Sequence, residues 1–137
     1  GNSVKPEGTG GWFIEPTIFR NVSPEMQIFR EELFGPVLAV VPFEDEEEAV
    51  RLANDSVYGL AAGIWTGDVT RAIRIAERIQ AGTIYVNNYF NSATQSPVGG
   101  YKQSGYGKEN GIEGMLSFMQ TKSVWLSTHL ETPNPFG

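Results

Sequence analysis

The sequence predicts an α/β fold, in which a mostly parallel sheet carries helices on both faces. Three apolar runs, at 37–41, 60–65 and 83–86, are typical of strands buried inside a sheet. Two segments between them repeat apolar residues at helical spacing. Strand, helix, strand, helix, strand is the pattern of parallel strands joined by helical crossovers. The 137 residues suit one compact domain.

The segment before the first apolar run predicts extended chain followed by a short helix. Residues 1–11 are rich in Gly and Pro, and we interpret them as a linker or truncated segment. Residues 12–19 are expected to be extended, with Pro16 at an edge or in a loop. Ser23 followed by Pro24 is typical of a helix start, and Gly35-Pro36 is expected to end that helix.

Two carboxylates mark the expected starts of the crossover helices. Asp45, with Glu48 three residues later, predicts a capping box, and the acidic run 44–48 suits the positive end of a helix. Asp68 is expected to cap the second helix, and Gly82 to close it.

The chain changes character after residue 86. Residues 87–110 are rich in Gly, Asn and Ser, and loops of that length are usually functional or disordered. Apolar residues between Ile112 and Met119 predict a final helix, and 123–126 predicts a last strand. Residues 128–137 form a polar tail.

Composition argues against several classes of function. The net charge of -6 does not suit nucleic acid, and no apolar run approaches the roughly 20 residues of a membrane helix. With no signal peptide visible, we expect a cytoplasmic protein. The absence of cysteine excludes disulfides, thiolate metal sites and a cysteine nucleophile within this chain. The single histidine, His129, lies in the polar tail, unlike the buried base of a catalytic triad.

The glycine-rich stretch 99–108 does not match a phosphate-binding loop. Glu109 stands where a P-loop has Ser or Thr, and Lys102 stands where it has Gly. The dinucleotide-binding pattern fails as well, because Asn110 replaces its third glycine. We therefore expect a loop that turns sharply and packs closely.

The run 31–36 brings two carboxylates and an aromatic ring to the start of a strand. Acids at a helix C-terminus oppose the helix dipole, and an unfavourable local choice can indicate a functional site. One carboxylate can accept two ribose hydroxyls, and a ring can pack on a flat heterocycle. The alternative is a helix end with solvated acids. The acidic run 44–48 serves the helix cap, and no residues show metal-ligand spacing.

Several motifs, in order and spacing, resemble the aldehyde dehydrogenase superfamily. They are GWFIEPT at 11–17, EELFGPV at 31–37, NDSVYGLAAG at 54–63, AGTIYVN at 81–87, PVGGYKQSG at 97–105 and GKENG at 107–111. The resemblance covers about residues 11–126. It implies oxidation of an aldehyde to an acid: a cysteine thiolate attacks the aldehyde, hydride passes to NAD(P)+, and a glutamate activates water.

The resemblance also implies a domain organisation. It assigns residues 12–120 to the C-terminal part of the catalytic domain and 121–127 to a strand of a sheet shared between subunits of a homo-oligomer. The cysteine nucleophile, the general-base glutamate and the asparagine of the oxyanion hole belong to earlier parts of the family's chain. This chain alone is therefore expected to be inactive, with no catalytic residue and no metal site of its own.

Site residues are carried over by the same resemblance. Glu32 matches the residue that holds the nicotinamide ribose hydroxyls, and Phe34 matches the aromatic residue near the nicotinamide. The loop 88–98 matches the wall of the substrate tunnel. The tunnel positions singled out in that loop are Tyr89, Phe90, Ser92 and Val98. The stretch 97–111 matches structural loops beneath the tunnel.

The tunnel loop gives a hint about the aldehyde. Betaine-aldehyde-type relatives carry an aromatic ring at the position of Tyr89, where cation–π attraction of roughly 0.5–2 kcal/mol would bind a quaternary ammonium group. The loop is also similar to those of amino-aldehyde and broad-range members. Both alternatives stay open.

Three functional hypotheses follow. The first is a fragment of an aldehyde dehydrogenase, which a start at Gly1 rather than Met favours. The second is a non-enzymatic module that keeps this fold for binding or assembly. The third is a small independent α/β enzyme that uses carboxylates, which would require a pair of acids with shifted pKa values in a pocket.

Overall fold

In the computed structural model, which describes residues 1–128 and 134–136, the strands form three separate two-stranded sheets. β1 (Ser3–Val4) pairs antiparallel with β2 (Phe13–Ile14). β3 (Thr17–Phe19) pairs parallel with β4 (Val37–Ala39), and β5 (Ala61–Ile64) pairs parallel with β6 (Thr83–Val86). The α/β class and the parallel pairing are thus confirmed. The candidate His129 lies outside the described residues.

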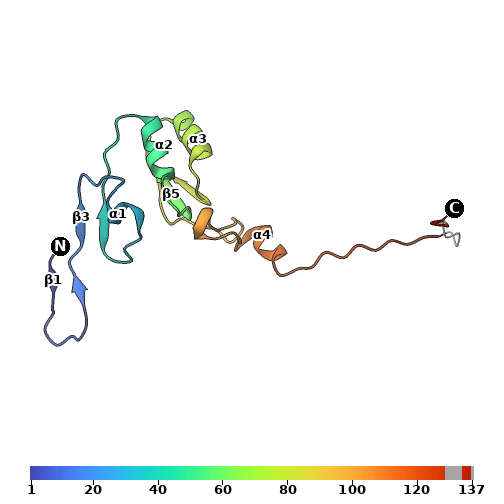
Figure 1. Cartoon of the computed structure of the whole chain (residues 1–137), viewed down its shortest axis with the longest axis horizontal. Helices are drawn as coiled ribbons and strands as arrows, with labels where there is room; N and C mark the ends of the chain where they lie inside the picture. Colours follow the sequence, from blue (N-terminus) through green and yellow to red (C-terminus); the bar gives the residue numbers. More distant parts are fainter. Residues whose placement is uncertain (129–133, 137) are drawn as a thin grey trace.

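The expected single sheet with helices on both faces is wrong for this chain. β4 and β5 share no hydrogen-bond ladder, so the two parallel pairs stay separate within the described residues. Helices α2 (Glu46–Asn54) and α3 (Val69–Arg78) lie side by side (Figure 1). Both border the same hollow over β5, beside Ala62 and Ile64, so they do not sit on opposite faces.

The two expected helix caps are confirmed. The Asp45 side chain accepts a hydrogen bond from the Glu48 backbone N–H at 2.8 Å. Glu48 reaches back to the backbone N–H of Glu44, at 2.9 Å, which closes a capping box one residue wider than the usual form. Asp68 accepts from the Arg71 N–H at 3.0 Å. These contacts satisfy N–H groups that a helix start leaves unpaired.

Gly82 does not close α3, which ends at Arg78, four residues earlier. A Cβ atom at Gly82 would lie 1.6 Å from the carbonyl oxygen of Gly99. The glycine is needed there because two backbones approach closely, not because a helix ends.

The remaining helices are shorter than the sequence predicts. α1 (Gln27–Arg30) follows Met26, which takes the N-cap position, so the helix start expected at Ser23 is wrong by three residues. The Met26 N–H instead donates to the Ser23 carbonyl at 3.1 Å and forms a turn. η1 (Lys102–Ser104) is a single 3-10 turn, and α4 (Gly111–Leu116) ends before Met119.

The buried core is small for a chain of this size. The buried apolar residues are Val22, Val50, Ile64, Ala72 and Ala81. The run 37–41, expected to be buried on both faces, leaves Leu38 57% exposed. The whole chain exposes 11655 Å², whereas a compact protein of 15.1 kDa exposes about 7,000 Å². Large apolar faces therefore stay uncovered.

The segment 121–127 takes no regular secondary structure in the single chain. It runs away from the body of the molecule (Figure 1), and Trp125 is 94% exposed. The strand expected at 123–126 is not formed, because none of the described strands pairs with it and a strand needs a hydrogen-bonded neighbour.

Candidate functional site

Two neighbouring carboxylates after α1 differ in their surroundings. Glu31 turns back onto the helix, because Gln27 Nε2 donates to its carboxylate at 2.7 Å. Glu32 makes no hydrogen bond or ion pair with any residue that the structure describes. Its carboxylate therefore keeps its acceptor positions available for a ligand.

Glu32 and Tyr58 line the same two hollows. One, of about 290 Å³, opens toward α1 and β4, and the other, of about 310 Å³, opens toward β5 and Ser104. Glu32 thus lies at the seam between the first parallel pair and the second. An acceptor at such a seam can bind hydroxyl groups with charge-assisted hydrogen bonds.

Phe34 presents an uncovered ring two residues further along. The ring is 99% exposed, and a bare aromatic face of that size is an unsatisfied apolar surface. Glu32 and Phe34 stand on one short loop between α1 and β4, so an acceptor and a flat apolar surface are offered close together.

A second group of residues gathers where β5 and β6 end. Tyr89 is its centre: the Tyr89 ring lies 5.2 Å from Tyr85, 6.4 Å from Trp65 and 4.8 Å from Phe90, centroid to centroid. The Phe90 ring meets Tyr89 edge to face, at 86°. Four aromatic rings at the carboxyl ends of parallel strands occupy the place where open α/β sheets bind ligands.

Backbone features fix this aromatic group. A Cβ atom at Gly63 would lie 2.5 Å from the Trp65 ring, so the glycine lets the ring lie against β5. The Asn87 side chain accepts from the Thr66 N–H and donates to the Thr66 carbonyl, both at 2.9 Å, which ties the two strand ends together. Phe90 has a φ of 59°, a costly conformation for a bulky residue. Such outliers cluster at functional sites.

The other two tunnel positions lie apart from the aromatic group. Val98 exchanges backbone hydrogen bonds of 2.8 and 2.7 Å with Glu109, which anchors it at the base of the loop. Ser92 is exposed. Glu32 lies beside the start of β5, and Tyr89 lies beside its end, so the structure places the two candidate walls along one strand.

Sequence reasoning missed Tyr58 and Trp65. Tyr58 shares the hollows of Glu32, and Trp65 packs on Tyr89. Trp65 is the last residue of the apolar run 60–65, and the rule that ligands bind at the carboxyl ends of parallel strands would have singled it out. Tyr58 carried no comparable signal.

The expectation of a closely packed glycine-rich loop is confirmed. A Cβ atom at Gly99 would lie 2.2 Å from the Gly107 carbonyl oxygen, too close for any side chain, as the 1.6 Å at Gly82 also is. Lys108 Nζ donates to the Gly99 carbonyl at 3.1 Å and lies 5.3 Å from the Tyr101 ring centroid. This lysine holds the loop together and is not presented to an anion.

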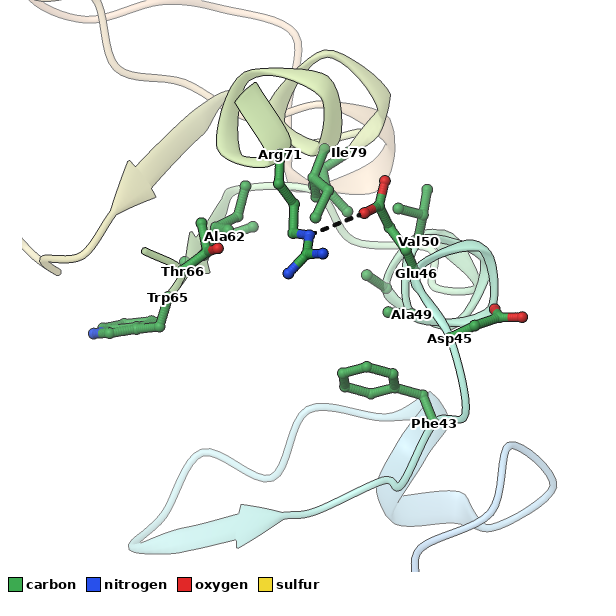
Figure 2. A pocket seen from close by; sticks show the side chains of 14 residues that line it. Phe43, Asp45, Glu46, Ala49, Val50, Ala62, Trp65, Thr66, Arg71 and Ile79 are labelled. Carbon is green, nitrogen blue, oxygen red and sulfur yellow. Dashed lines mark ion pairs between the residues drawn. The ribbon is translucent and has the colours of Figure 1, made fainter. Parts of the chain in front are cut away.

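An apolar hollow of about 620 Å³ lies between α2, α3 and β5 (Figure 2). Ala49, Val50 and Ile79 line it, and the Phe43 ring faces it from the segment before α2. Arg71 and Glu46 form an ion pair at its rim, at 3.4 Å.

The shifted carboxyl groups are all held ionised. Hydrogen bonds from Arg74 and Arg78 lower the pKa of Glu46 and of Glu47, respectively, and Arg30 lowers the pKa of Asp55 in the same way. The hydroxyl of Ser23 lowers the pKa of Glu25. None of these four groups suits a general acid at neutral pH, so they give the hypothesis of a small carboxylate enzyme no support.

The described part of the chain has neither a metal-ligand cluster nor a helix that could span a membrane. It holds no cluster of three or more His, Cys, Asp or Glu side chains able to bind a metal ion. Its helices are all too short or too polar to span a membrane.

Comparison with known proteins gives a consistent picture. Residues 1–124 match the model of the aldehyde dehydrogenase family. A betaine aldehyde dehydrogenase of Brucella anthropi is 49% identical over 116 residues, which are 85% of this chain and 24% of that relative.

Solved structures agree with the sequence relatives. An aldehyde dehydrogenase of Mycobacterium tuberculosis, complexed with NAD+, is 49% identical with a TM-score of 0.83, over 93% of this chain and 26% of that one. The indole-3-acetaldehyde dehydrogenase AldA of P. syringae, in complex with NAD+ and IAA, is 41% identical with a TM-score of 0.86, over 91% and 25%. The chain thus spans about a quarter of the length of the relatives it matches.

Proposed function

The chain belongs to the aldehyde dehydrogenase family, and from this premise we propose that it is the C-terminal portion of an enzyme that oxidises aldehydes to carboxylic acids with NAD+ or NADP+. The main support for the proposal is that the Glu32 carboxylate has no partner among the described residues. It stands on a loop that also presents the exposed ring of Phe34. The NAD+ complexes of two structural relatives support the cofactor.

The residues on this loop fit a nicotinamide nucleotide. Glu32 would accept the hydroxyls of the nicotinamide ribose, and Phe34 would pack near the ring, which hides apolar surface that this chain leaves exposed. The bound cofactor supplies the acceptor for the aldehyde's hydride. Glu32 and Phe34 orient it and take no part in bond making.

Tyr89, Phe90, Ser92 and Val98 form the substrate wall in this proposal. Tyr89 sits among three other aromatic rings, and the relative from Brucella anthropi is a betaine aldehyde dehydrogenase. We infer that betaine or amino aldehydes are the favoured substrate class, because aromatic faces attract ammonium cations.

The chain alone is proposed to be inactive, because it has no cysteine to attack the aldehyde. The complete enzyme is proposed to be a homo-oligomer in which residues 121–127 add a strand to a sheet between subunits. The exposure of Trp125 and the lack of a partner strand among the described residues support this role.

The test compares two proteins made from the same gene. The complete gene product and the chain alone are each incubated with a set of aldehydes and either NAD+ or NADP+, and formation of the reduced cofactor is followed by absorbance. We expect steady turnover by the complete product and none by the chain. A complete product that binds no nicotinamide nucleotide and oxidises no aldehyde would support the binding-module hypothesis instead.

A further inference from the structure

Helix α1, which carries the loop of Glu32, is weakly attached to the rest of the molecule. It is four residues long, and none of its residues is buried. Its backbone hydrogen bonds are local, such as Phe29 N–H to the Met26 carbonyl at 3.0 Å. Its apolar residues Ile28 and Phe29 are only half-buried, so packing alone holds the helix loosely.

Arg30 supplies the missing attachment. Its Nη1 lies 2.7 Å from Asp55 Oδ1, and its Nε donates to the Pro24 carbonyl at 2.5 Å. The guanidinium also lies 5.1 Å from the ring centroid of Phe29. Among the described residues, no other member of 24–35 makes a hydrogen bond or ion pair with any residue after 37.

Asp55 stands on the firmer side of this contact. It is the C-cap of α2, and Lys102 Nζ donates to the carbonyls of the residues on either side of it, Asn54 at 2.8 Å and Ser56 at 3.0 Å. Three residues later comes Tyr58, which lines both hollows of Glu32. Asp55 therefore lies on the same segment as Tyr58, and Lys102 ties that segment to the glycine-rich loop.

We propose that Arg30 and Asp55 are a positioning pair that holds Glu32 opposite Tyr58 across the seam between the two parallel sheets. The inference rests on the proposed function, because it takes Glu32 as the group that holds the ribose. Neither Arg30 nor Asp55 touches the cofactor. They act only through the place of α1.

The ion pair is expected to contribute little to folding stability, which distinguishes a positioning role from a structural one. The side chains are 46% and 38% exposed, and exposed ion pairs contribute little to folding. Losing the pair should leave the fold in place and let α1 shift. A misplacement of about 1 Å in a positioning element can lower a reaction rate by as much as about 100-fold, and a ribose held off its acceptor also loses hydrogen bonds.

A double-mutant cycle on the complete enzyme tests the pair. We expect Arg30→Ala and Asp55→Ala each to raise the dissociation constant for NAD+ by about tenfold. The double variant should also raise the dissociation constant about tenfold, because the effects of two residues that act through one contact are not additive. The melting temperature and the KM for aldehyde should stay near the parent values.

Arg71→Ala is the matched control, because it breaks an ion pair of 3.4 Å between α3 and Glu46 of α2 that involves neither Arg30 nor Asp55. It should leave NAD+ binding unchanged. If Arg30→Ala does not fold, Arg30→Lys, which keeps the charge but not the fork of donors, should give an intermediate rise in the dissociation constant.

Two results would overturn the inference. One is NAD+ affinity within about twofold of the parent in both single variants, and the other is a double variant weakened by the product of the single effects. Glu32→Gln is measured alongside. If Glu32→Gln leaves NAD+ binding intact, the proposed role of Glu32 fails. If Glu32→Gln weakens binding and Arg30→Ala does not, only the positioning role fails.

Discussion

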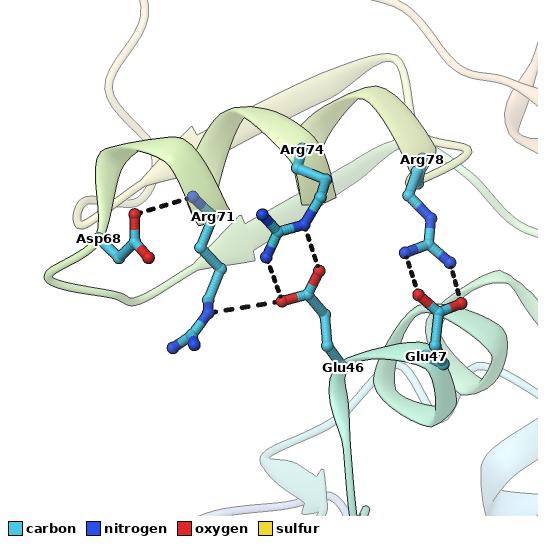
Figure 3. Close-up of polar contacts among 6 residues, drawn as sticks. All are labelled: Glu46, Glu47, Asp68, Arg71, Arg74 and Arg78. Carbon is cyan, nitrogen blue, oxygen red and sulfur yellow. Dashed lines mark hydrogen bonds and ion pairs between the residues drawn. The ribbon is translucent and has the colours of Figure 1, made fainter.

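Glu46 and Arg74 form a bidentate ion pair: the distances from Arg74 Nε to Glu46 Oε1 and from Arg74 Nη2 to Glu46 Oε2 are both 2.7 Å (Figure 3). Glu47 and Arg78 repeat the arrangement further along, with Nη1 to Oε1 at 2.7 Å. The same carboxylates lie in the first turn of α2, where negative charge suits the helix dipole. Two acids thus stabilise the start of one helix and bind it to the next.

We predict that Glu46→Gln combined with Glu47→Gln lowers the melting temperature of the chain at neutral pH by a few degrees at most, since exposed ion pairs contribute little. The arginine partners hold both pKa values below the ordinary value of 4.5. The stabilisation is therefore present above about pH 4.5 and lost as pH falls through the lower folded values. Melting curves from circular dichroism should differ near neutral pH and converge in acid.

Glu77→Gln is the control for this pair of substitutions. Glu77 lies on α3, is exposed, and has no hydrogen bond or ion pair among the described residues. The Glu77→Gln variant should have the same melting temperature as the parent at every pH. A double variant that keeps the same difference from the parent in acid would show that charge pairing is not the cause.

The second prediction concerns the chain by itself. With no cysteine, it should not reduce NAD+ or NADP+ in the presence of any aldehyde. The measurement is reduced-cofactor absorbance against a heat-treated sample. Turnover above that background, proportional to protein concentration, would mean that another group attacks the aldehyde.

The third prediction concerns Glu32 in the complete enzyme. Glu32→Gln should weaken hydrogen bonds to the cofactor worth roughly 1.5–3 kcal/mol, with reduced cofactor affinity and kcat. Phe34→Ala should act in the same direction. Neither should lower stability much, because Glu32 lacks partners among the described residues and Phe34 is 99% exposed. Glu31→Gln, which removes a neighbouring charge but keeps an oxygen that can accept from Gln27, is the matched control. Equal kinetics for Glu32→Gln and Glu31→Gln would restore the solvated-acid alternative.

The fourth prediction separates cation recognition from general apolar packing at Tyr89. Tyr89→Leu should raise the KM for betaine aldehyde about twofold to thirtyfold, the range of a cation–π contact of roughly 0.5–2 kcal/mol. The KM for the neutral aldehyde in which carbon replaces the quaternary nitrogen should change much less.

Tyr106→Leu is the control, since Tyr106 is fully exposed and outside the aromatic group. Equal losses for both aldehydes would contradict cation recognition.

Local signals in the sequence predicted local structure well. The helix starts at Asp45 and Asp68 and the parallel pairing of 61–64 with 83–86 follow from side-chain caps and apolar runs, which need only a few neighbours. Short apolar runs, by contrast, could not say how many strands join in one sheet. That number depends on hydrogen-bond partners beyond the run itself, and β4 and β5 have none in common.

The candidate site divides in the same way. Glu32, Phe34 and Tyr89 could be named from motifs, because each belongs to a short run of residues of fixed order. Tyr58 lies near Glu32, and Arg30 contacts Asp55, but the two residues of each pair are about 25 positions apart in the sequence. No periodicity connects them, so only the folded chain brings them together.

The fifth prediction is that the isolated chain self-associates at micromolar concentration. It exposes 11655 Å², whereas a compact protein of its mass exposes about 7,000 Å². Many large apolar side chains are exposed, which favours association, and the unpaired edges of the two parallel pairs offer backbone groups to another chain. Residues 124–126 add a run of large apolar side chains, with Trp125 94% exposed.

A single charge on this segment should reduce the association. Trp125→Lys places a cation on the expected edge strand, and edge lysines oppose strand pairing. Trp12→Lys is the matched control, because Trp12 is 99% exposed but lies outside 121–127. Light scattering across a concentration series should give dimers or larger species for the parent and for Trp12→Lys, and smaller species for Trp125→Lys, with unchanged circular dichroism. A monodisperse parent monomer at high concentration would refute the prediction. If the two lysine substitutions reduced association equally, the contact would lie on the apolar faces of the α/β units and not in 121–127.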